Sequence, residues 1–462
     1  MQAVRLLTLL ALPTLVSCKA QTPPDVTMSI ISDLHVAPGA TSERIFAEAA
    51  MPRIATAAPD LLLVTGDLTE RGDLQSHQQV AQSLAQQEAN GKTRVYVIPG
   101  NHDLYGQAVS REEFAQVYAD FGYDEAILRH DQSLSYLAYP AEGLALLCLD
   151  TTREPDGNRR HSDGGIDLPL LEWAEQAAAT ARQDGRRVIG LMHHELMEHF
   201  DRQSLLAQNY VANGDTLRYP SLATVHERLT QAGVHLMFTG HFHIQSIQHV
   251  QTTAGELYDV STGSLANYPS PIRTATLTGL GQLTLTSDTV AMAHDEQLQR
   301  NSAIVHSILQ RGVARLFPMM SRVQGSLPTR IRQMIQLPAT ADEMLADLTQ
   351  YMQPALTDVY NAMALGDEDQ HDPDLLYRAT YEALNAYTVH VCKGNQMMAA
   401  FLTEGMSNPA ASDELPASPD ENYMALADSV LRSILYNYRG APTNDVSDAT
   451  LTLQLPQTAS TW

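Results

Sequence analysis

The sequence is poor in three features, and each shortage argues against a class of protein. It holds three cysteines in 462 residues, and none lies in the polar motifs described below, so a zinc site built from thiolates is not indicated. It contains 29 lysines and arginines but 53 aspartates and glutamates, which gives a formal charge of -24. Nucleic acids are bound mainly through lysine and arginine, so we expect no nucleic-acid partner. Beyond residue 16 no apolar run is long enough to cross a bilayer.

The two cysteines beyond the amino terminus are expected to be thiols. Cys148 lies in the apolar run of residues 144–149, which is typical of a buried strand. A bridge to Cys392 is the alternative in an oxidising compartment, but no pattern in the sequence supports it.

The amino terminus resembles the signal peptide of a bacterial lipoprotein. Residues 6–16 are apolar, and Leu15-Val16-Ser17-Cys18 resembles the lipobox. The resemblance implies a signal peptide over residues 1–18, lipidation at Cys18 and a linker over residues 19–26. We therefore expect an exported protein, periplasmic or anchored to the outer membrane through several acyl chains. An ordinary secretory peptide is the alternative.

The pattern of the chain changes near residue 292. Its length and its 44% hydrophobic content suggest two domains. Over residues 27–292, short apolar runs alternate with helical stretches, which predicts an α/β sandwich. The predicted helices occupy residues 41–57, 74–89, 110–120 and 168–182.

Strand-like runs nearly disappear after residue 292, so we expect a C-terminal all-helical domain over residues 293–440. Apolar residues at this spacing are what helix packing needs, and they indicate no ligand site. The remaining residues, 441–462, are expected to be a tail that is either loose or holds a late strand at 451–455. One clear helix signal comes from Met344, Leu345, Leu348, Tyr351 and Met352.

Five short polar segments each follow an apolar run of the first domain. The runs occupy residues 26–31, 61–65, 95–98, 188–192 and 235–239 and are typical of buried strands. Because ligands of open α/β sheets gather beyond the carboxyl ends of the strands, one fold can bring all five segments together. The segments are Asp33-Leu34-His35, Gly66-Asp67, Gly100-Asn101-His102-Asp103, His193-His194 and Gly240-His241-Phe242-His243.

The residue types in these segments indicate a metal site. Imidazoles, carboxylates and one amide suit Mn, Fe, Zn or Co. Two divalent ions about 3.5 to 4 Å apart can clamp a phosphoryl group and share a hydroxide as nucleophile. Taken singly, each segment could be an ordinary polar turn, since Gly and Asn both favour turns. The ordered set is far more specific than any one member.

This ordered set resembles the calcineurin-like metallophosphoesterase family, whose pattern is D-x-H, G-D, G-N-H-D/E, H and G-H-x-H. The resemblance covers roughly residues 26–271 and implies a metallophosphoesterase-type α/β sandwich that hydrolyses phosphoesters with two divalent metal ions. It implies that Asp67 bridges the ions and that His102 faces the substrate as a catalytic residue. It places Asp33, His35 and His243 on one ion and Asn101, His193 and His241 on the other.

Two residues near the motifs have alternative interpretations. His194 is expected to lie beside the site, because the family's ligand here is the first histidine of the pair, His193. Glu70 holds the place where relatives often carry an aspartate that pairs with the histidine of G-N-H. It either orients His102 or is a solvated loop residue.

The substrate is indicated less clearly than the metal site. Residues 262–264 and 267–271 resemble the loop after G-H-x-H in bacterial class III cyclic-nucleotide phosphodiesterases. This resemblance favours a small-molecule phosphodiester, with cyclic nucleotides among the candidates. Phosphomonoesters, lipid headgroups and pyrophosphates are the alternatives, because the pocket rim selects the leaving group. The alternative of another class is a non-catalytic surface lipoprotein that binds a partner. The sequence does not indicate an oligomeric state.

Overall fold

The structure is a computed structural model of the whole chain. It describes residues 22–89, 91–104, 109–153, 161–199, 218–267, 270–290, 337–358, 385–393 and 450–456, with shorter stretches at 299–321 and 382–383. The predicted signal peptide and Cys18 lie outside the described residues, as does most of the segment 293–440. Within the described part, no helix combines the length and apolar character that crossing a bilayer requires.

Two β-sheets form the centre of the first domain, which confirms the predicted α/β fold. The first sheet has the strand order β13-β12-β11-β1-β2-β3. Strands β1, β2 and β3 are parallel, and β11, β12 and β13 are antiparallel to their neighbours. The strands are β1 (Val26–Ile31), β2 (Leu61–Val64), β3 (Arg94–Val97), β11 (Pro271–Leu277), β12 (Gln282–Thr289) and β13 (Thr450–Gln454).

The second sheet has the strand order β4-β5-β6-β7-β8-β10-β9. Its central strands β6, β7, β8 and β10 are parallel to one another. The strands are β4 (Leu128–Arg129), β5 (Tyr136–Ala141), β6 (Leu144–Leu149), β7 (Arg187–Met192), β8 (Val234–Thr239), β9 (Ser246–Thr252) and β10 (Gly255–Ser261).

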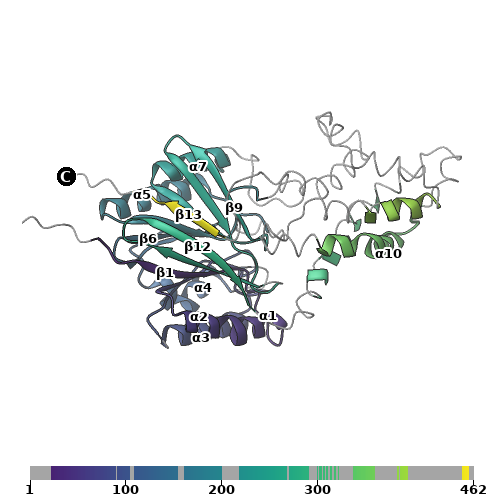
Figure 1. Cartoon of the computed structure of the whole chain (residues 1–462), viewed down its shortest axis with the longest axis horizontal. Helices are drawn as coiled ribbons and strands as arrows, with labels where there is room; N and C mark the ends of the chain where they lie inside the picture. The colour runs from purple at the N-terminus through teal and green to yellow at the C-terminus, as the bar shows by residue number, and fades with distance from the viewer. Residues whose placement is uncertain are drawn as a thin grey trace, which may run out of the picture.

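Helices cover the outer faces of the two sheets (Figure 1). On one side lie α1 (Thr41–Arg44), the π-helical η1 (Ile45–Ala50), α2 (Met51–Ala57) and α3 (Leu74–Ala89). On the other side lie α5 (Leu168–Gln183) and α7 (Leu222–Gln231). The short α4 (Arg111–Val117) and η2 (Ala119–Tyr123) follow β3. The four predicted helices of this domain are thereby confirmed, with η1 as a π-helical interruption of the first.

The apolar run of β6 shows why its sequence does not alternate with polar residues. Leu144, Leu146 and Cys148 belong to the core between the sheets. The residues between them face α5 and α7 and belong to a second core. A strand covered on both faces needs apolar residues at every position.

Two later segments match predicted elements. Residues 341–351 form α10 (Ala341–Tyr351), capped by Thr340, whose side chain accepts from Glu343 N. Residues 450–454 form β13, the yellow strand of Figure 1, which pairs with β12 at the edge of the first sheet. The strand interpretation of the late segment is therefore confirmed, whereas the predicted limits of the helical domain remain predictions.

Both described cysteines are free thiols, as the sequence analysis favoured. Burial raises the pKa of Cys148 to about 12. Because the reactive thiolate forms only as the pH approaches that value, we expect Cys148 not to react with an aromatic disulfide reagent at mildly alkaline pH. The measurement is made on Cys18→Ser Cys392→Ala protein. One equivalent of thiol should appear only in denaturant, and stoichiometric reaction of the native protein would contradict the burial of Cys148.

Candidate metal centre

The five polar segments lie together at one end of the sandwich. Six of the seven predicted ligands fall into groups whose ligand atoms lie within 4.8 Å of one another. The seventh, Asn101, follows Gly100, which lies so close to Asp67 that a Cβ on it would overlap that residue. The predicted ligands follow their strands in this order: Asp33 and His35 after β1, Asp67 after β2, Asn101 after β3, His193 after β7, and His241 and His243 after β8.

Three of the motif glycines are required because the segments approach too closely for a side chain. A Cβ on Gly66 would lie 2.7 Å from His193 Nδ1, and its φ of +96° also favours glycine. A Cβ on Gly100 would overlap Asp67, and one on Gly240 would overlap the segment after β1. The glycine before each of these polar residues therefore allows the ligand-bearing segments to pack against one another.

The backbone is strained at the candidate ligands. Five of the eight described non-glycine residues with positive φ are candidate ligands. Such conformations cost about 1 kcal/mol or more for most residues and cluster at functional sites, where the surrounding structure holds them. The five are Asp33 (φ 52°), His35 (44°), Asp67 (49°), His241 (79°) and His243 (63°).

Backbone hydrogen bonds hold these conformations. Asp33 N donates to Gly66 O at 3.1 Å, and His35 N donates to Asp67 O at 3.0 Å. Ser264 Oγ donates to Asp33 O at 2.8 Å. The segments after β1 and β2 therefore continue side by side beyond their strands, which fixes the spacing of the two carboxylates.

One group of ligand atoms is formed by Asp33, His35 and His243. The Nε2 atoms of His35 and His243 lie 3.0 Å apart, and His243 Nε2 lies 3.4 Å from Asp33 Oδ1. Burial lowers the pKa of His35, although contact with the Glu70 side chain opposes the shift. A neutral imidazole is the form that binds a metal ion. The geometry therefore fits the predicted first ion.

Asp67 lies between the two groups of ligands. Its Oδ2 is 3.8 Å from His35 Nε2 and 3.3 Å from His193 Nε2, while its Oδ1 accepts from His102 N at 2.8 Å. One carboxylate oxygen thus faces a histidine of each predicted ion. This is the arrangement that the predicted bridging role requires.

His193 is oriented as a ligand. Its Nδ1 donates to Thr65 O at 2.8 Å, which directs Nε2 toward Asp67. Metal-binding histidines commonly donate their other ring N–H to a carbonyl in this way. Burial alone would lower the pKa of His193, but the adjacent Asp67 carboxylate outweighs it and raises the pKa to about 9. The negative charge of Asp67 therefore favours a positive charge, such as a metal ion, between Asp67 and His193.

Asn101 provides a second sign that the residues fit a cation. Its Oδ1 is buried, and no donor among the described residues forms a hydrogen bond with it. An amide oxygen in such a position normally has a partner, because burying an acceptor without one costs about 1–3 kcal/mol. A divalent cation would satisfy it, so the donor set fits the metals expected from the sequence.

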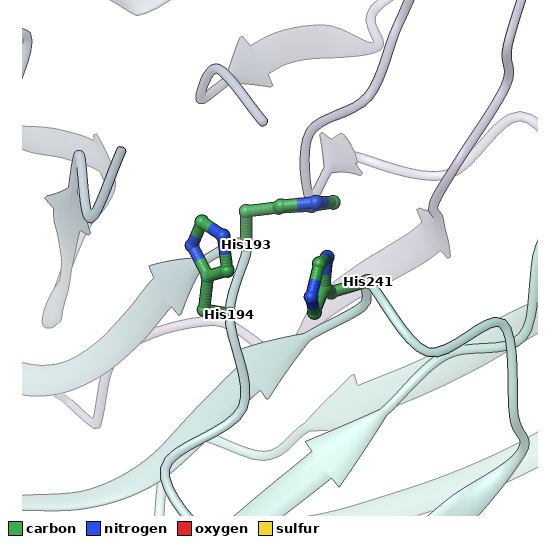
Figure 2. A group of neighbouring side chains, drawn as sticks. All are labelled: His193, His194 and His241. Atoms are coloured by element: carbon green, nitrogen blue, oxygen red, sulfur yellow. The ribbon is translucent and has the colours of Figure 1, made fainter. Parts of the chain in front are cut away.

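Three imidazole rings meet beside the second group of ligands (Figure 2). The ring centroids of His193 and His241 lie 5.1 Å apart, and His194 lies 4.6 Å from His241. Both nitrogens of His194 have partners: Thr151 Oγ1 lies 2.8 Å from Nδ1, and Ser162 O lies 3.2 Å from Nε2. Although all three could share an ion by distance, these hydrogen bonds favour His193 and His241 as ligands and His194 as a neighbour.

Burial keeps two of these three imidazoles, His194 and His241, in the neutral form. Burial lowers the pKa of His194 to about 3, with the charge on His193 adding to the shift. Burial also holds the pKa of His241 well below its usual value. Both rings are neutral at physiological pH, as metal ligands and their neighbours need to be.

His102 is oriented by the backbone of Glu70. His102 Nδ1 donates to Glu70 O at 2.8 Å, whereas the Glu70 carboxylate lies 3.1 Å from His35 Nδ1. The side chain of Glu70 therefore supports a predicted ligand and is not simply a solvated loop residue. Burial opposes protonation of His102, but Asp67 and the Glu70 carbonyl outweigh it and raise the pKa. With Nδ1 bonded to a carbonyl, the proton that His102 exchanges is the one on Nε2.

Asp103 belongs to the third motif but was not among the predicted site residues. Its buried carboxylate accepts from Leu68 N at 3.1 Å, Thr69 N at 2.9 Å and Gly100 N at 2.9 Å. It therefore joins the segment after β2 to the segment after β3. The sequence signal for this connecting role was the aspartate that directly follows His102 in the motif.

Asp259, a buried residue of β10, was not predicted to belong to the site. Asp259 Oδ2 accepts from Leu196 N at 2.6 Å and Met197 N at 3.0 Å, and its Oδ1 accepts from Thr239 Oγ1 at 2.6 Å. His199 Nε2 lies 3.2 Å from Oδ2. Asp259 thus joins the segment after His193 to the end of β8, which leads to His241.

We expect Asp259→Asn to weaken metal binding at His193 and His241 without unfolding the protein. The substitution keeps the shape but replaces one acceptor oxygen by a donor, so the two ligand segments lose part of their connection. Changes of this kind typically reduce metal affinity about 10- to 100-fold. Metal titration with circular dichroism measures both effects. Unchanged affinity of both sites would exclude this positioning role.

The chain was compared with protein families, with curated proteins and with solved structures. Residues 27–245 match the family model described as calcineurin-like phosphoesterase. Solved structures that resemble the chain include a dimetal phosphatase from Danio rerio, with 14% identity and a TM-score of 0.42 over 58% of this chain and 96% of that chain. Another is GAP50, the anchor in the inner membrane complex of Plasmodium, with 9% identity and a TM-score of 0.37 over 58% and 85%. No curated protein sequence matches the chain.

Proposed function

Because residues 27–245 match the family model described as calcineurin-like phosphoesterase, we propose that this protein hydrolyses small-molecule phosphoesters at a centre of two divalent metal ions. When bound, such ions activate water and stabilise the negative charge of the phosphoryl group. The residues that would hold them are the seven predicted ligands. The observation that carries the proposal is the position of Asp67 Oδ2, which faces His35 Nε2 at 3.8 Å and His193 Nε2 at 3.3 Å.

Side chains of the protein would attract the cations and supply a proton to the leaving group. Asp33 and Asp67 are buried carboxylates that attract cations into an end of the sandwich lined by imidazoles. His102 is held by the Glu70 carbonyl with its exchangeable proton on Nε2. It is therefore suited to give a proton to a departing alkoxide, which is a poor leaving group.

We favour phosphodiesters, including cyclic nucleotides, among the substrates. Support comes from the loop after β10, which resembles that of bacterial class III phosphodiesterases in sequence. In the structure this loop lies against the centre: Ser264 Oγ donates to Asp33 O, and the Asn267 amide lies 2.7 Å from His243 Nδ1. Residues 268–269 lie outside the described part of the chain.

The test of this proposal compares two substrates over four metals. Purified protein lacking residues 1–18 is assayed with bis(p-nitrophenyl) phosphate and with p-nitrophenyl phosphate after loading with Mn, Fe, Zn or Co. We expect turnover of the diester to exceed that of the monoester. Faster cleavage of the monoester would favour a phosphomonoesterase. No turnover of either substrate with any metal would favour the non-catalytic alternative, a surface lipoprotein that binds a partner.

We also propose that the protein is exported and anchored to a membrane through Cys18. The support is the lipobox-like segment at residues 15–18. Cys18→Ala should leave the protein unacylated and soluble, because several acyl chains are needed for stable attachment. Fractionation after a high-salt wash is the measurement. Recovery of the variant in the membrane fraction would contradict the proposal.

A further inference from the structure

A cavity of about 240 Å³ lies where α5 and α7 end and β7 and β8 begin, away from the metal centre. Three arginines line it: Arg182 in the last turn of α5, Arg186 just before β7, and Arg187 as the first residue of β7. His235 of β8 lines it too. Leu455 and Pro456, which follow β13, form a wall from the first sheet.

The cavity and the predicted metal ligands lie at opposite ends of the same strands. Arg187 is the first residue of β7, and His193 follows its last residue. At about 3.3 Å per residue, their Cα atoms are about 20 Å apart. The same holds for β8, where His235 lies near the start and His241 follows the end. An ion bound in the cavity would therefore not touch the predicted metal ligands.

The charge of the three arginines is not neutralised by carboxylates. Their hydrogen bonds go to backbone carbonyls: Arg182 Nη1 to Gln231 O at 3.4 Å, Arg186 Nη1 to Ala141 O at 2.7 Å, and Arg187 Nη1 to Gly279 O at 3.0 Å. Within the described ranges, none of the three forms an ion pair with an aspartate or glutamate.

The acidic residues nearest in sequence are engaged elsewhere. Asp184 accepts from Tyr139 Oη at 2.6 Å, and Glu256 accepts from Tyr258 Oη at 2.9 Å. In a chain with 53 acidic residues and only 29 lysines and arginines, three guanidinium groups without a carboxylate need a physical reason. Clustered like charges repel one another unless an anion lies between them.

Two of these guanidinium groups also have a buried N–H donor that makes no hydrogen bond to the described residues. The Nε atoms of Arg186 and Arg187 are buried and have no hydrogen-bond partner among the described residues. Burial lowers the pKa of Arg187, as expected for a cation without a compensating charge. Planar guanidinium groups with several N–H donors match the oxygens of phosphate and similar anions.

We propose that this cavity binds a small multivalent oxyanion of the phosphate or sulfate class. Its volume suits a compact anion, and its basic side chains supply charge and N–H donors from the end of α5 and the start of β7. The site does not depend on the proposed hydrolysis and would exist in a non-catalytic protein as well. The competing role for the arginines is to hold the ends of strands and helices together through the carbonyl bonds described above.

The experiment measures inorganic phosphate binding by titration calorimetry on the full chain, before and after removal of metal ions with a chelator and desalting. Chelation removes phosphate bound at the metal centre. We expect one phosphate per chain to remain bound, with sulfate competing and acetate competing poorly. Loss of all phosphate binding on chelation would overturn the proposal.

Two variants and a matched control separate anion binding from a structural role. Arg187→Gln and Arg182→Gln should each weaken phosphate binding about tenfold or more in the chelated protein, because each removes a charged hydrogen-bond donor. Arg182 has the longer carbonyl bond of the two, so Arg182→Gln is expected to keep the melting temperature. Arg53→Gln, which removes an arginine paired with Asp288 on another face, should bind as the wild type. Equal phosphate affinity in all three variants would leave the arginines with a structural role only.

Discussion

Asp67→Ala is expected to remove metal from both predicted positions and to abolish phosphoester hydrolysis. Two divalent ions about 4 Å apart repel each other by about 17 kcal/mol at an effective dielectric constant of about 20. Asp67 Oδ2 faces a histidine of each ligand group, at 3.8 Å and 3.3 Å, so its loss removes a carboxylate placed to attract both ions at once. Metal content should fall by more than one ion per chain.

Elemental analysis of the purified variant, together with circular dichroism, measures this effect. Asp288→Ala is the matched control, because it removes an aspartate that pairs with Arg53 at an exposed position, where such pairs contribute about 0–1 kcal/mol. The control should keep two ions and full activity. Two ions still bound per chain in Asp67→Ala would show that Asp67 is not the bridge.

His102→Ala is expected to keep both ions and to lose activity according to the leaving group. A positioned proton donor contributes about 10²- to 10⁴-fold in rate. The loss should be of that size for an alkyl phosphodiester, whose alkoxide needs a proton. It should be smaller for a p-nitrophenyl ester, whose leaving group hardly needs one. The raised pKa of His102 keeps more of the protonated donor available as the pH rises toward neutrality.

The measurement is kcat for one alkyl and one p-nitrophenyl diester, with metal content determined on the same preparations. His249→Ala is the control, since His249 of β9 stacks on Tyr258 of the neighbouring β10. It should retain the rates of the wild type on both substrates. Equal losses on the two substrates in His102→Ala would argue against proton donation, and loss of an ion would make His102 a ligand.

The strands and helices of the first domain were predictable because their signals are local. The five apolar runs became β1, β2, β3, β7 and β8, and no boundary is shifted by more than one residue. The convergence of the predicted ligands was predictable for the same reason, since each of them follows its strand and parallel strands end at one edge. The glycines before Asp67, Asn101 and His241 carried further information, because only a residue without a side chain fits where these segments cross.

Contacts between distant residues were not predictable in this way. Nothing in the sequence around Asp259 indicates that its carboxylate joins the segment after His193 to the end of β8. Likewise, a Glu at position 70 allowed two interpretations, and only the folded chain placed its carboxylate on His35 and its carbonyl on His102. Each of these contacts depends on the distance between separate segments, which local patterns do not encode.

The sequence by itself determined the metal-binding residues to be considered, the strands that carry them and the excess of negative charge. Tertiary structure alone decided which nitrogen of each histidine faces Asp67, because the carbonyl of Thr65 sets the orientation of His193. It also decided that Arg182, Arg186 and Arg187 line one cavity and that, among the described residues, none of them pairs with a carboxylate. The physical reason is the same in both cases: hydrogen bonds and charges act over a few ångströms, and those separations exist only once the two sheets have packed together.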